Sequence, residues 1–189
     1  MILNIFGPSG SGKTTLIKEL LKNDKLQTFF EKIYKEKNIK IVNNEVSISL
    51  IPLPKFRGCV KEFFSIFSID INILLSLNEE LSKLSESIFS KINNKKTLNK
   101  ISLREIETLS AGELRRLFIL KSLLVNSPLL IIDEPFSNSD EKLWDIIFKS
   151  FSVYSNVIIL SHIPLNKNFT LKEGDLSINI VEARDRFYN

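Results

Sequence analysis

The fold is decided by one short glycine-rich stretch near the start of the chain, Gly7-Pro8-Ser9-Gly10-Ser11-Gly12-Lys13-Thr14. This loop matches the phosphate-binding pattern G-x-x-x-x-G-K-S/T at every fixed position. An apolar run, Met1–Phe6, precedes the loop and is typical of a buried strand, and Thr15–Leu21 follows it with helical spacing. A chance glycine turn is the alternative, but a strand, a loop and a helix are the context that the pattern requires. We therefore predict an α/β fold built around a polyphosphate site.

Each part of the loop suits a nucleotide. Its glycines let successive backbone N–H groups point inward as a nest for an anion, and the following helix N-terminus adds partial positive charge. Lys13 can reach the β- and γ-phosphates, and Thr14 can offer its hydroxyl to Mg²⁺. We expect the whole stretch from Gly7 through Thr15 to bind the nucleotide.

A second motif supplies carboxylates. Leu129–Ile132 is an apolar run typical of a strand buried on both faces of a parallel sheet, and Asp133 and Glu134 follow it. Because Pro135 cannot donate to the ladder, the strand ends here, where ligands bind in open α/β sheets. Asp133 then suits the Mg²⁺ shell, and Glu134 suits a general base for water. A solvated acidic turn is the alternative, which the phosphate loop disfavours.

The third motif indicates a family. A short stretch after Leu109 reads Ser110-Ala111-Gly112-Glu113 and leads into a basic helix. A serine, a small residue and a glycine at a helix start form a possible second site for an anion. An ordinary capped helix would show a similar pattern. The position of the stretch, about twenty residues before Asp133, favours the anion site over an ordinary cap. The stretch resembles the signature sequence of the ATP-binding cassette (ABC) ATPases. That resemblance implies that it closes on the γ-phosphate held by another subunit.

Two further pieces fit the resemblance. Ser137 and Asp140 match the segment that follows the acidic strand in ABC proteins, although Ser139 stands where the family usually has leucine. His162, the only histidine, follows the apolar run Asn156–Ser161 at the family's switch-histidine position, which implies contact with the γ-phosphate. A lone histidine on the surface or in the core is the alternative.

The chain also departs from the family. Only six residues precede Gly7, so we expect the N-terminal antiparallel strands to be truncated and the adenine-stacking aromatic residue to be absent from its usual place. A family glutamine should follow the strand expected at Val46–Ile51, yet Pro52–Gly58 contains none. The only glutamine, Gln27, lies too early in the chain.

Composition agrees with one domain. The 189 residues are 43% hydrophobic and 25% charged, with no apolar run long enough to span a bilayer and no pattern of a signal peptide. We expect a mainly parallel sheet flanked by helices, with a core at about 1–54 and 109–189 and an inserted helical subdomain at about 55–108. A terminal hairpin is predicted over 169–181. A single cysteine suits a reducing compartment, and because the basic residues behind the +4 charge are scattered, we expect no direct nucleic acid binding.

The resemblance implies an ATPase with ATP and Mg²⁺ as its ligands. Thr14 and Asp133 would hold Mg²⁺, Glu134 would activate water, and Lys13 and His162 would stabilise charge on the γ-phosphate. Two copies, or this chain and a related ABC subunit, would pair head to tail around ATP. We expect a cytoplasmic subunit, peripheral on the inner face of the cell membrane through separate membrane-spanning transporter subunits. The alternatives are a soluble ABC ATPase acting on nucleic acid or the ribosome, and a non-hydrolysing regulatory subunit.

Overall fold

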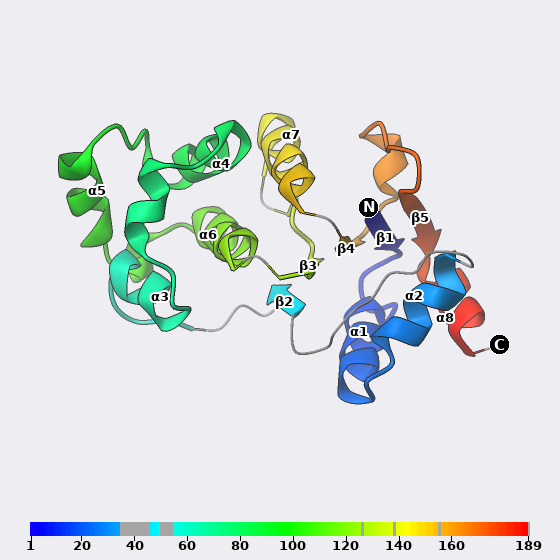
Figure 1. Ribbon diagram of the computed structural model, residues 1–189. Helices are drawn as coiled ribbons and strands as arrows, with labels where there is room; N and C mark the ends of the chain where they lie inside the picture. The colour runs from blue at the N-terminus through cyan, green and yellow to red at the C-terminus, as the bar shows by residue number, and fades with distance from the viewer. Residues whose placement is uncertain (35–45, 50–54, 126, 138, 155, 189) are drawn as a thin grey trace. The chain divides into compact units, whose positions relative to one another are not determined.

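The structure, a computed structural model, describes residues 1–34, 46–49, 55–125, 127–137, 139–154 and 156–188 (Figure 1). The chain forms two compact units that interleave along the sequence. The first contains Met1–Ile51, Ser127–Glu134 and Tyr154–Asn189, and the second contains Pro52–Asn126 and Pro135–Val153. Within the described residues, no helix is both long and apolar enough to cross a membrane.

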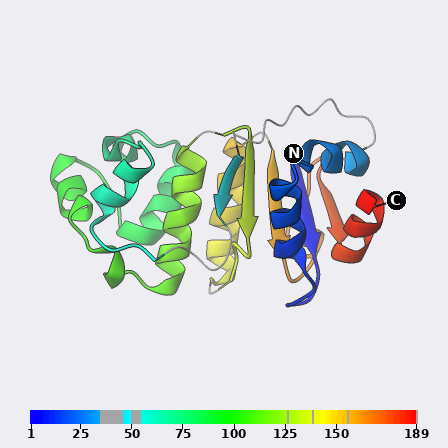
Figure 2. The ribbon, with the colours of Figure 1, turned by 90° about the horizontal axis from the view of Figure 1, so that it is seen from below.

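The first unit is built on a parallel sheet. Its strands are β1 (Ile2–Phe6), β2 (Val46–Ser49), β3 (Leu129–Asp133), β4 (Val157–Ser161) and β5 (Leu176–Asn179). They lie in the order β2-β3-β4-β1-β5, and every pairing among the described strands is parallel (Figure 2). The predicted parallel sheet flanked by helices is therefore confirmed.

The central strands are buried because their sequences are apolar on both faces. Every residue of β3 and β4 is buried. The register pairs Asp133 with Leu160 and Phe6 with Ser161, so the carboxyl ends of β3, β4 and β1 meet at one edge. Residues that follow these three strands therefore start from the same edge of the sheet.

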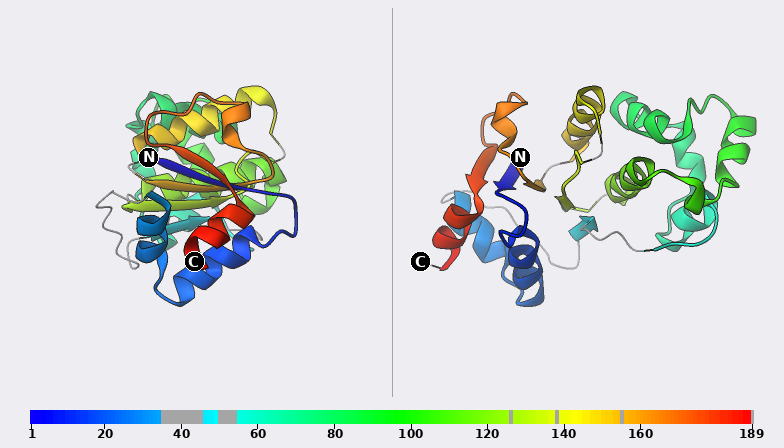
Figure 3. Two further views of the ribbon diagram at one scale, coloured as in Figure 1. Left: turned by 90° about the vertical axis from the view of Figure 1, so that its right-hand side faces the viewer. Right: turned by 180° about the vertical axis from the view of Figure 1, so that it is seen from behind.

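Three helices of the first unit pack on one face of this sheet. They are α1 (Lys13–Lys22), α2 (Leu26–Tyr34) and α8 (Ile180–Tyr188), which lie together below the strands in Figure 1 and in the left panel of Figure 3. Alternate strand residues such as Leu3, Ile131 and Leu160 join their apolar side chains in a single core. Phe29 of α2 meets Phe187 of α8 edge to face, with ring centroids 5.8 Å apart, which fastens the last helix to the second.

The predicted terminal hairpin is wrong. The turn at 172–175 forms, but no strand occurs at 169–171, and β5 instead pairs in parallel with β1. Asp175 accepts a hydrogen bond from the Ile2 N–H at 2.7 Å, which draws β5 against β1. Asn179 then accepts a bond from the Val181 N–H, and this side-chain contact ends the strand where α8 begins.

One or two strands were expected at 39–51, and β2 is observed within that range. Positions 39–45 and 50–51 lie outside the described residues. Positions 52–54 of the segment without a glutamine also lie outside them.

The second unit is helical. It contains α3 (Val60–Ile66), α4 (Glu79–Phe89), α5 (Lys95–Ser102), α6 (Ala111–Leu124) and α7 (Glu141–Ser150), with short 3-10 turns η2 (Ile71–Leu75), η3 (Ile106–Thr108) and η4 (Phe151–Val153). Phe63 is the centre of its aromatic core, and its ring meets those of Phe56, Phe64, Phe67 and Phe118 at 5.1–5.6 Å. This unit includes the range expected for the helical subdomain and adds α6 and α7 to it.

Candidate functional site

The phosphate loop joins β1 to α1. Gly10 and Gly12 have φ of +75° and +89°, a left-handed backbone that glycine adopts without a steric penalty. Gly12 is the N-cap of α1 and has no side chain that could accept a hydrogen bond from the first N–H groups of the helix. Lys13 is 6% exposed, and its Nζ donates to the carbonyls of Gly7 at 2.7 Å and Pro8 at 3.2 Å. The ammonium therefore lies within the curve of the loop.

The remaining residues of the loop line its surface. Pro8, Ser9, Gly10 and Thr15 are exposed, and Gly7 is buried at the end of β1. Ser11 is half-buried, and its Oγ has no hydrogen-bond partner among the described residues although the atom itself is buried. A buried hydroxyl without a partner in a glycine-rich loop suits a site that takes an anionic, oxygen-rich ligand.

Thr14 and Asp133 offer a pair of oxygen ligands. The Thr14 hydroxyl donates to Asp133 Oδ2 at 2.7 Å, and Asp133 is 5% exposed. Mg²⁺ prefers oxygen ligands at about 2.0–2.1 Å in octahedral geometry, which places neighbouring ligands about 2.9 Å apart. The hydroxyl and the carboxylate therefore fit Mg²⁺ in both chemistry and separation.

Glu134 has a left-handed backbone directly after β3. Its φ is +49°, while its N–H donates to the Leu160 carbonyl at 2.9 Å and so extends the pairing with β4. Its side chain is 15% exposed, with Oε1 3.7 Å from Lys13 Nζ and 3.4 Å from His162 Nε2. A glutamate in this backbone region is uncommon, and such positions are concentrated at functional sites. The turn directs the carboxylate toward Lys13 at the start of α1 and His162 at the end of β4.

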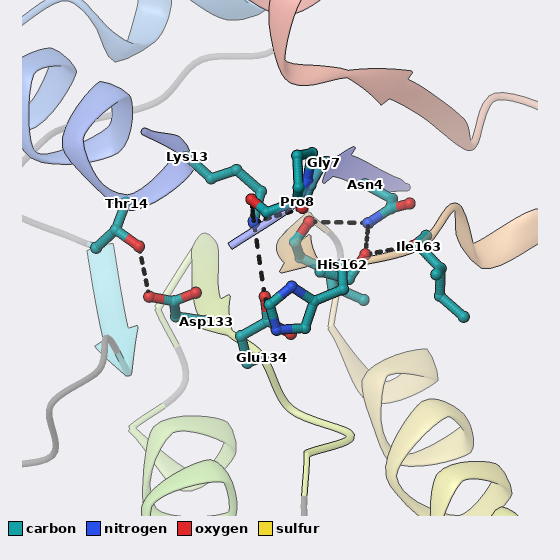
Figure 4. Close-up of polar contacts among 11 residues, drawn as sticks. Asn4, Gly7, Pro8, Lys13, Thr14, Asp133, Glu134, His162 and Ile163 are labelled. Atoms are coloured by element: carbon teal, nitrogen blue, oxygen red, sulfur yellow. Dashed lines mark hydrogen bonds and ion pairs between the residues drawn. The ribbon is translucent and has the colours of Figure 1, made fainter. Parts of the chain in front are cut away.

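Figure 4 shows these side chains converging within the first unit. Lys13 and Thr14 come from the start of α1, Asp133 and Glu134 from the end of β3, and His162 from the end of β4. A cation, two carboxylates, a hydroxyl and an imidazole therefore gather at the edge where parallel strands end, which is where such sheets bind ligands. This arrangement defines the class of a phosphate-loop nucleotide-binding protein.

The signature-like segment is built in the second unit. Ser110 is the N-cap of α6, its Oγ accepts from the Glu113 N–H at 3.2 Å, and Glu113 Oε2 accepts from the Ser110 N–H at 2.8 Å. This reciprocal capping leaves Ser110 and Ala111 exposed and Gly112 half-buried at the helix start. Burial raises the pKa of the Glu113 carboxyl, but bonds from Ser110 and the charge of Arg104, 3.3 Å away, outweigh it and lower the pKa below its ordinary value.

Sequence reasoning missed three residues whose side chains bind backbone groups within their own units. Asn4 is a fully buried amide in the middle of β1, and its signal was a lone polar residue within an apolar run. Arg184 of α8 brings Nη2 to 3.5 Å from the carbonyl of Gly12, across 172 positions of sequence. In the second unit, the Trp144 indole N–H donates to the carbonyls of Phe136 and Ser139, which follow the acidic strand.

Comparison with known proteins identifies the family. The model of the family described as "ABC transporter" matches residues 1–137. The chain therefore belongs to the ABC transporter family, and the resemblance drawn from its motifs is confirmed.

Two curated relatives carry names from transport. "Zinc import ATP-binding protein ZnuC" of Wigglesworthia glossinidia brevipalpis is 32% identical over 171 residues, which cover 85% of this chain and 64% of that protein. "Molybdate/tungstate import ATP-binding protein WtpC" of Methanocaldococcus jannaschii is 29% identical over 173 residues, which cover 85% of this chain and 51% of that protein. The chain thus spans about half to two thirds of the length of these relatives.

Solved structures share the fold. A putative ABC transporter ATP-binding protein from Pyrococcus furiosus superposes with a TM-score of 0.57 and 20% identity, over 96% of this chain and 84% of that one. The archaeal ribosome recycling factor aABCE1, solved with the ribosomal stalk protein aP1, superposes with a TM-score of 0.59 and 19% identity, over 99% of this chain and 36% of that one. At such identities the likeness establishes the fold and nothing finer.

Proposed function

We propose that this chain binds ATP with Mg²⁺ and hydrolyses it, as the ATP-binding subunit of a transporter whose membrane-spanning subunits are separate chains. One observation carries the enzymatic part: Glu134 Oε1 lies 3.4 Å from His162 and 3.7 Å from Lys13. The Mg²⁺-compatible pair of Thr14 and Asp133 lies on the same strand end and helix start. Family membership and the transport names of the relatives support the physiological part.

Each residue has a chemical task in hydrolysis. The loop N–H groups and the Lys13 ammonium hold the phosphates and stabilise the charge that develops on the γ-phosphate. Glu134 orients the attacking water and accepts its proton, and His162 contributes a polar hydrogen bond to the γ-phosphate. Thr14 and Asp133 are the residues that would hold Mg²⁺, which when bound neutralises charge between the β- and γ-phosphates.

The second half of the site comes from another subunit in this proposal. The N-terminus of α6 begins at the exposed Ser110, and the backbone N–H groups of Ala111 and Gly112, which the capping bonds between Ser110 and Glu113 do not use, would bind an anion. In a head-to-tail homodimer, or a heterodimer with a related ABC subunit, these groups would contact the γ-phosphate bound by the partner. ATP then joins the two subunits, and hydrolysis releases them.

The transported substrate belongs to the partner subunits. The two relatives are named for zinc and for molybdate or tungstate, a cation and two oxyanions, so their names do not agree on a cargo. Peripheral attachment to the cytoplasmic face of the membrane, through spanning subunits, is the location that this role requires.

A matched pair of glutamate substitutions tests the enzymatic proposal. Glu134→Gln keeps the size of the side chain but removes its basicity, so we expect ATP binding to persist while turnover falls about 100-fold or more. Glu173→Gln changes an exposed residue of the 172–175 turn and should hydrolyse ATP normally. Lys13→Ala should abolish ATP binding. Normal hydrolysis by Glu134→Gln would refute the assignment of the catalytic base.

The physiological partner is tested by capture. Tagged Glu134→Gln protein, purified with ATP from gently solubilised cells, should bring a membrane protein with several spans, identified by mass spectrometry. Recovery of ribosomal or nucleic-acid machinery instead would replace the transporter with a soluble ABC ATPase.

A further inference from the structure

Asn4 is a buried polar residue whose hydrogen bonds are all made. It lies in the middle of β1 with no exposed surface, between Ile159 of β4 and Ser177 of β5. Its Nδ2 donates to the Ile159 carbonyl at 3.1 Å and to Ser161 Oγ at 2.8 Å. Its Oδ1 accepts from the Leu165 N–H at 3.0 Å and from Ser177 Oγ at 2.6 Å. Two donors and two acceptors use the full capacity of the amide.

This network fixes the orientation of the amide. The Leu165 N–H can only donate and the Ile159 carbonyl can only accept, so turning the amide over would oppose donor to donor and acceptor to acceptor. Buried polar groups left without a partner destabilise the folded chain. Asn4 therefore holds its neighbours in one arrangement.

Asn4 is bonded to residues that lie before and after His162 in the sequence. Ser161, which accepts one of these hydrogen bonds, precedes the histidine and donates from its Oγ to the Ile163 carbonyl at 2.6 Å. Leu165 lies three positions after the histidine and donates its backbone N–H to Asn4 Oδ1. Figure 4 shows Asn4 beside this loop, with His162 projecting from it toward Glu134. The Ser161 hydroxyl and the Leu165 N–H, which lie on either side of His162 in sequence, are therefore both bonded to one side chain of β1.

The side chain of His162 has little packing of its own. It is 53% exposed, and its Nε2 lies 3.4 Å from Glu134 Oε1. Because few neighbours enclose this imidazole, its position depends mainly on the position of the backbone at His162. We infer that Asn4 is a positioning residue, which acts through Ser161 and Leu165 to hold His162 at the phosphate site. The catalytic consequence rests on the proposed function, whereas the positioning itself does not.

The single histidine makes this inference measurable. In protein labelled at histidine, one imidazole gives signals, so its NMR spectrum reports His162 alone. Asn4→Leu replaces the amide with an apolar group of similar size. If Asn4→Leu does not fold, Asn4→Ser is used in its place, because its hydroxyl is too short to reach Leu165. Ser177→Ala is the matched control, because it removes one bond of the same network on the β5 side and leaves the bonds to Ser161 and Leu165.

We expect the Asn4 variants to shift or broaden the His162 signals in nucleotide-free protein, whereas Ser177→Ala leaves them in place. With ATP, kcat should fall about tenfold or more while the Kd for ATP stays within about twofold, since misplacement affects the reacting geometry more than binding. Unchanged His162 signals in the folded Asn4 variants would overturn the inference, as would an equal shift in Ser177→Ala. If the wild-type chain hydrolysed no ATP, the proposed function would fail, but the spectra would still decide the role of Asn4.

Discussion

The hydroxyl of Thr14 donates a hydrogen bond of 2.7 Å to Asp133, a residue 119 positions away in sequence. The bond joins the first turn of α1 to the end of β3. The phosphate loop and the acidic strand, which the sequence places on separate elements, are therefore in direct contact. Both groups are hard oxygen ligands, and their separation fits neighbouring positions around Mg²⁺.

Removing the Thr14 hydroxyl should raise the Mg²⁺ requirement. We expect Thr14→Ala to need about tenfold more Mg²⁺ for half-maximal ATP hydrolysis, equivalent to about 1.4 kcal/mol, because one of two protein ligands is lost. Thr14→Ser keeps the hydroxyl and should titrate like the wild type. An identical Mg²⁺ titration for Thr14→Ala and Thr14→Ser would exclude the hydroxyl from the metal site.

The left-handed backbone of Glu134 predicts that a glycine at this position gives a more stable chain than an alanine. At ordinary helix and strand positions glycine is less stable than alanine, but at φ +49° alanine bears a steric penalty of about 1 kcal/mol that glycine does not. Glu134→Gly should therefore be more stable to urea than Glu134→Ala, although both lack turnover. Greater stability of Glu134→Ala would show that the strain is absent in solution.

Trp144 anchors the loop that follows the acidic strand. Its indole Nε1 lies 3.0 Å from the Phe136 carbonyl and 2.9 Å from the Ser139 carbonyl. Trp144→Phe keeps an aromatic ring but removes the donor, so the free energy of unfolding should fall by about 1 kcal/mol in urea denaturation. Ser139→Ala retains the accepting carbonyl and should unfold like the wild type. A comparable loss in Ser139→Ala would mean that the serine side chain, and not the indole bond, holds the loop.

The strand ends were predictable, because local patterns determine them. Apolar runs identified β1, β3 and β4, and a parallel sheet then required the residues after them to share an edge. Glu134 could be named on that basis, and His162 from its strand end together with the resemblance to the ABC family, before their 3.4 Å contact was known.

Other features depend on contacts that no local pattern encodes. β5 was predicted as part of a hairpin, since a glycine turn between apolar runs favours one, but Asp175 binds the backbone of Ile2 and draws the strand into parallel pairing. Asn4 stood out only as a polar residue in an apolar run, and its importance depends on partners more than 150 positions away. No local pattern around Trp144 indicates that its indole binds the carbonyls of Phe136 and Ser139.

The capping of α6 should make part of the chain's stability depend on pH. The pKa of Glu113 is lowered in the folded chain from an unfolded value of about 4.3, so the charged form contributes stability that is fully present above that value. This contribution is lost as the pH falls through the lower folded pKa. We therefore expect Glu113→Ala to unfold about 1 kcal/mol more easily than wild type at pH 7 and to differ much less near pH 3.

Urea unfolding followed by circular dichroism measures this difference at each pH. Glu113→Gln is the matched control, since its amide oxygen can still accept from the Ser110 N–H but does not titrate. The gap between Glu113→Gln and Glu113→Ala should stay constant from pH 7 to pH 3, while the gap between wild type and Glu113→Ala narrows. A wild-type advantage that grew toward low pH would mean that the carboxyl is held in its neutral form, and that burial outweighs the bonds from Ser110 and Arg104.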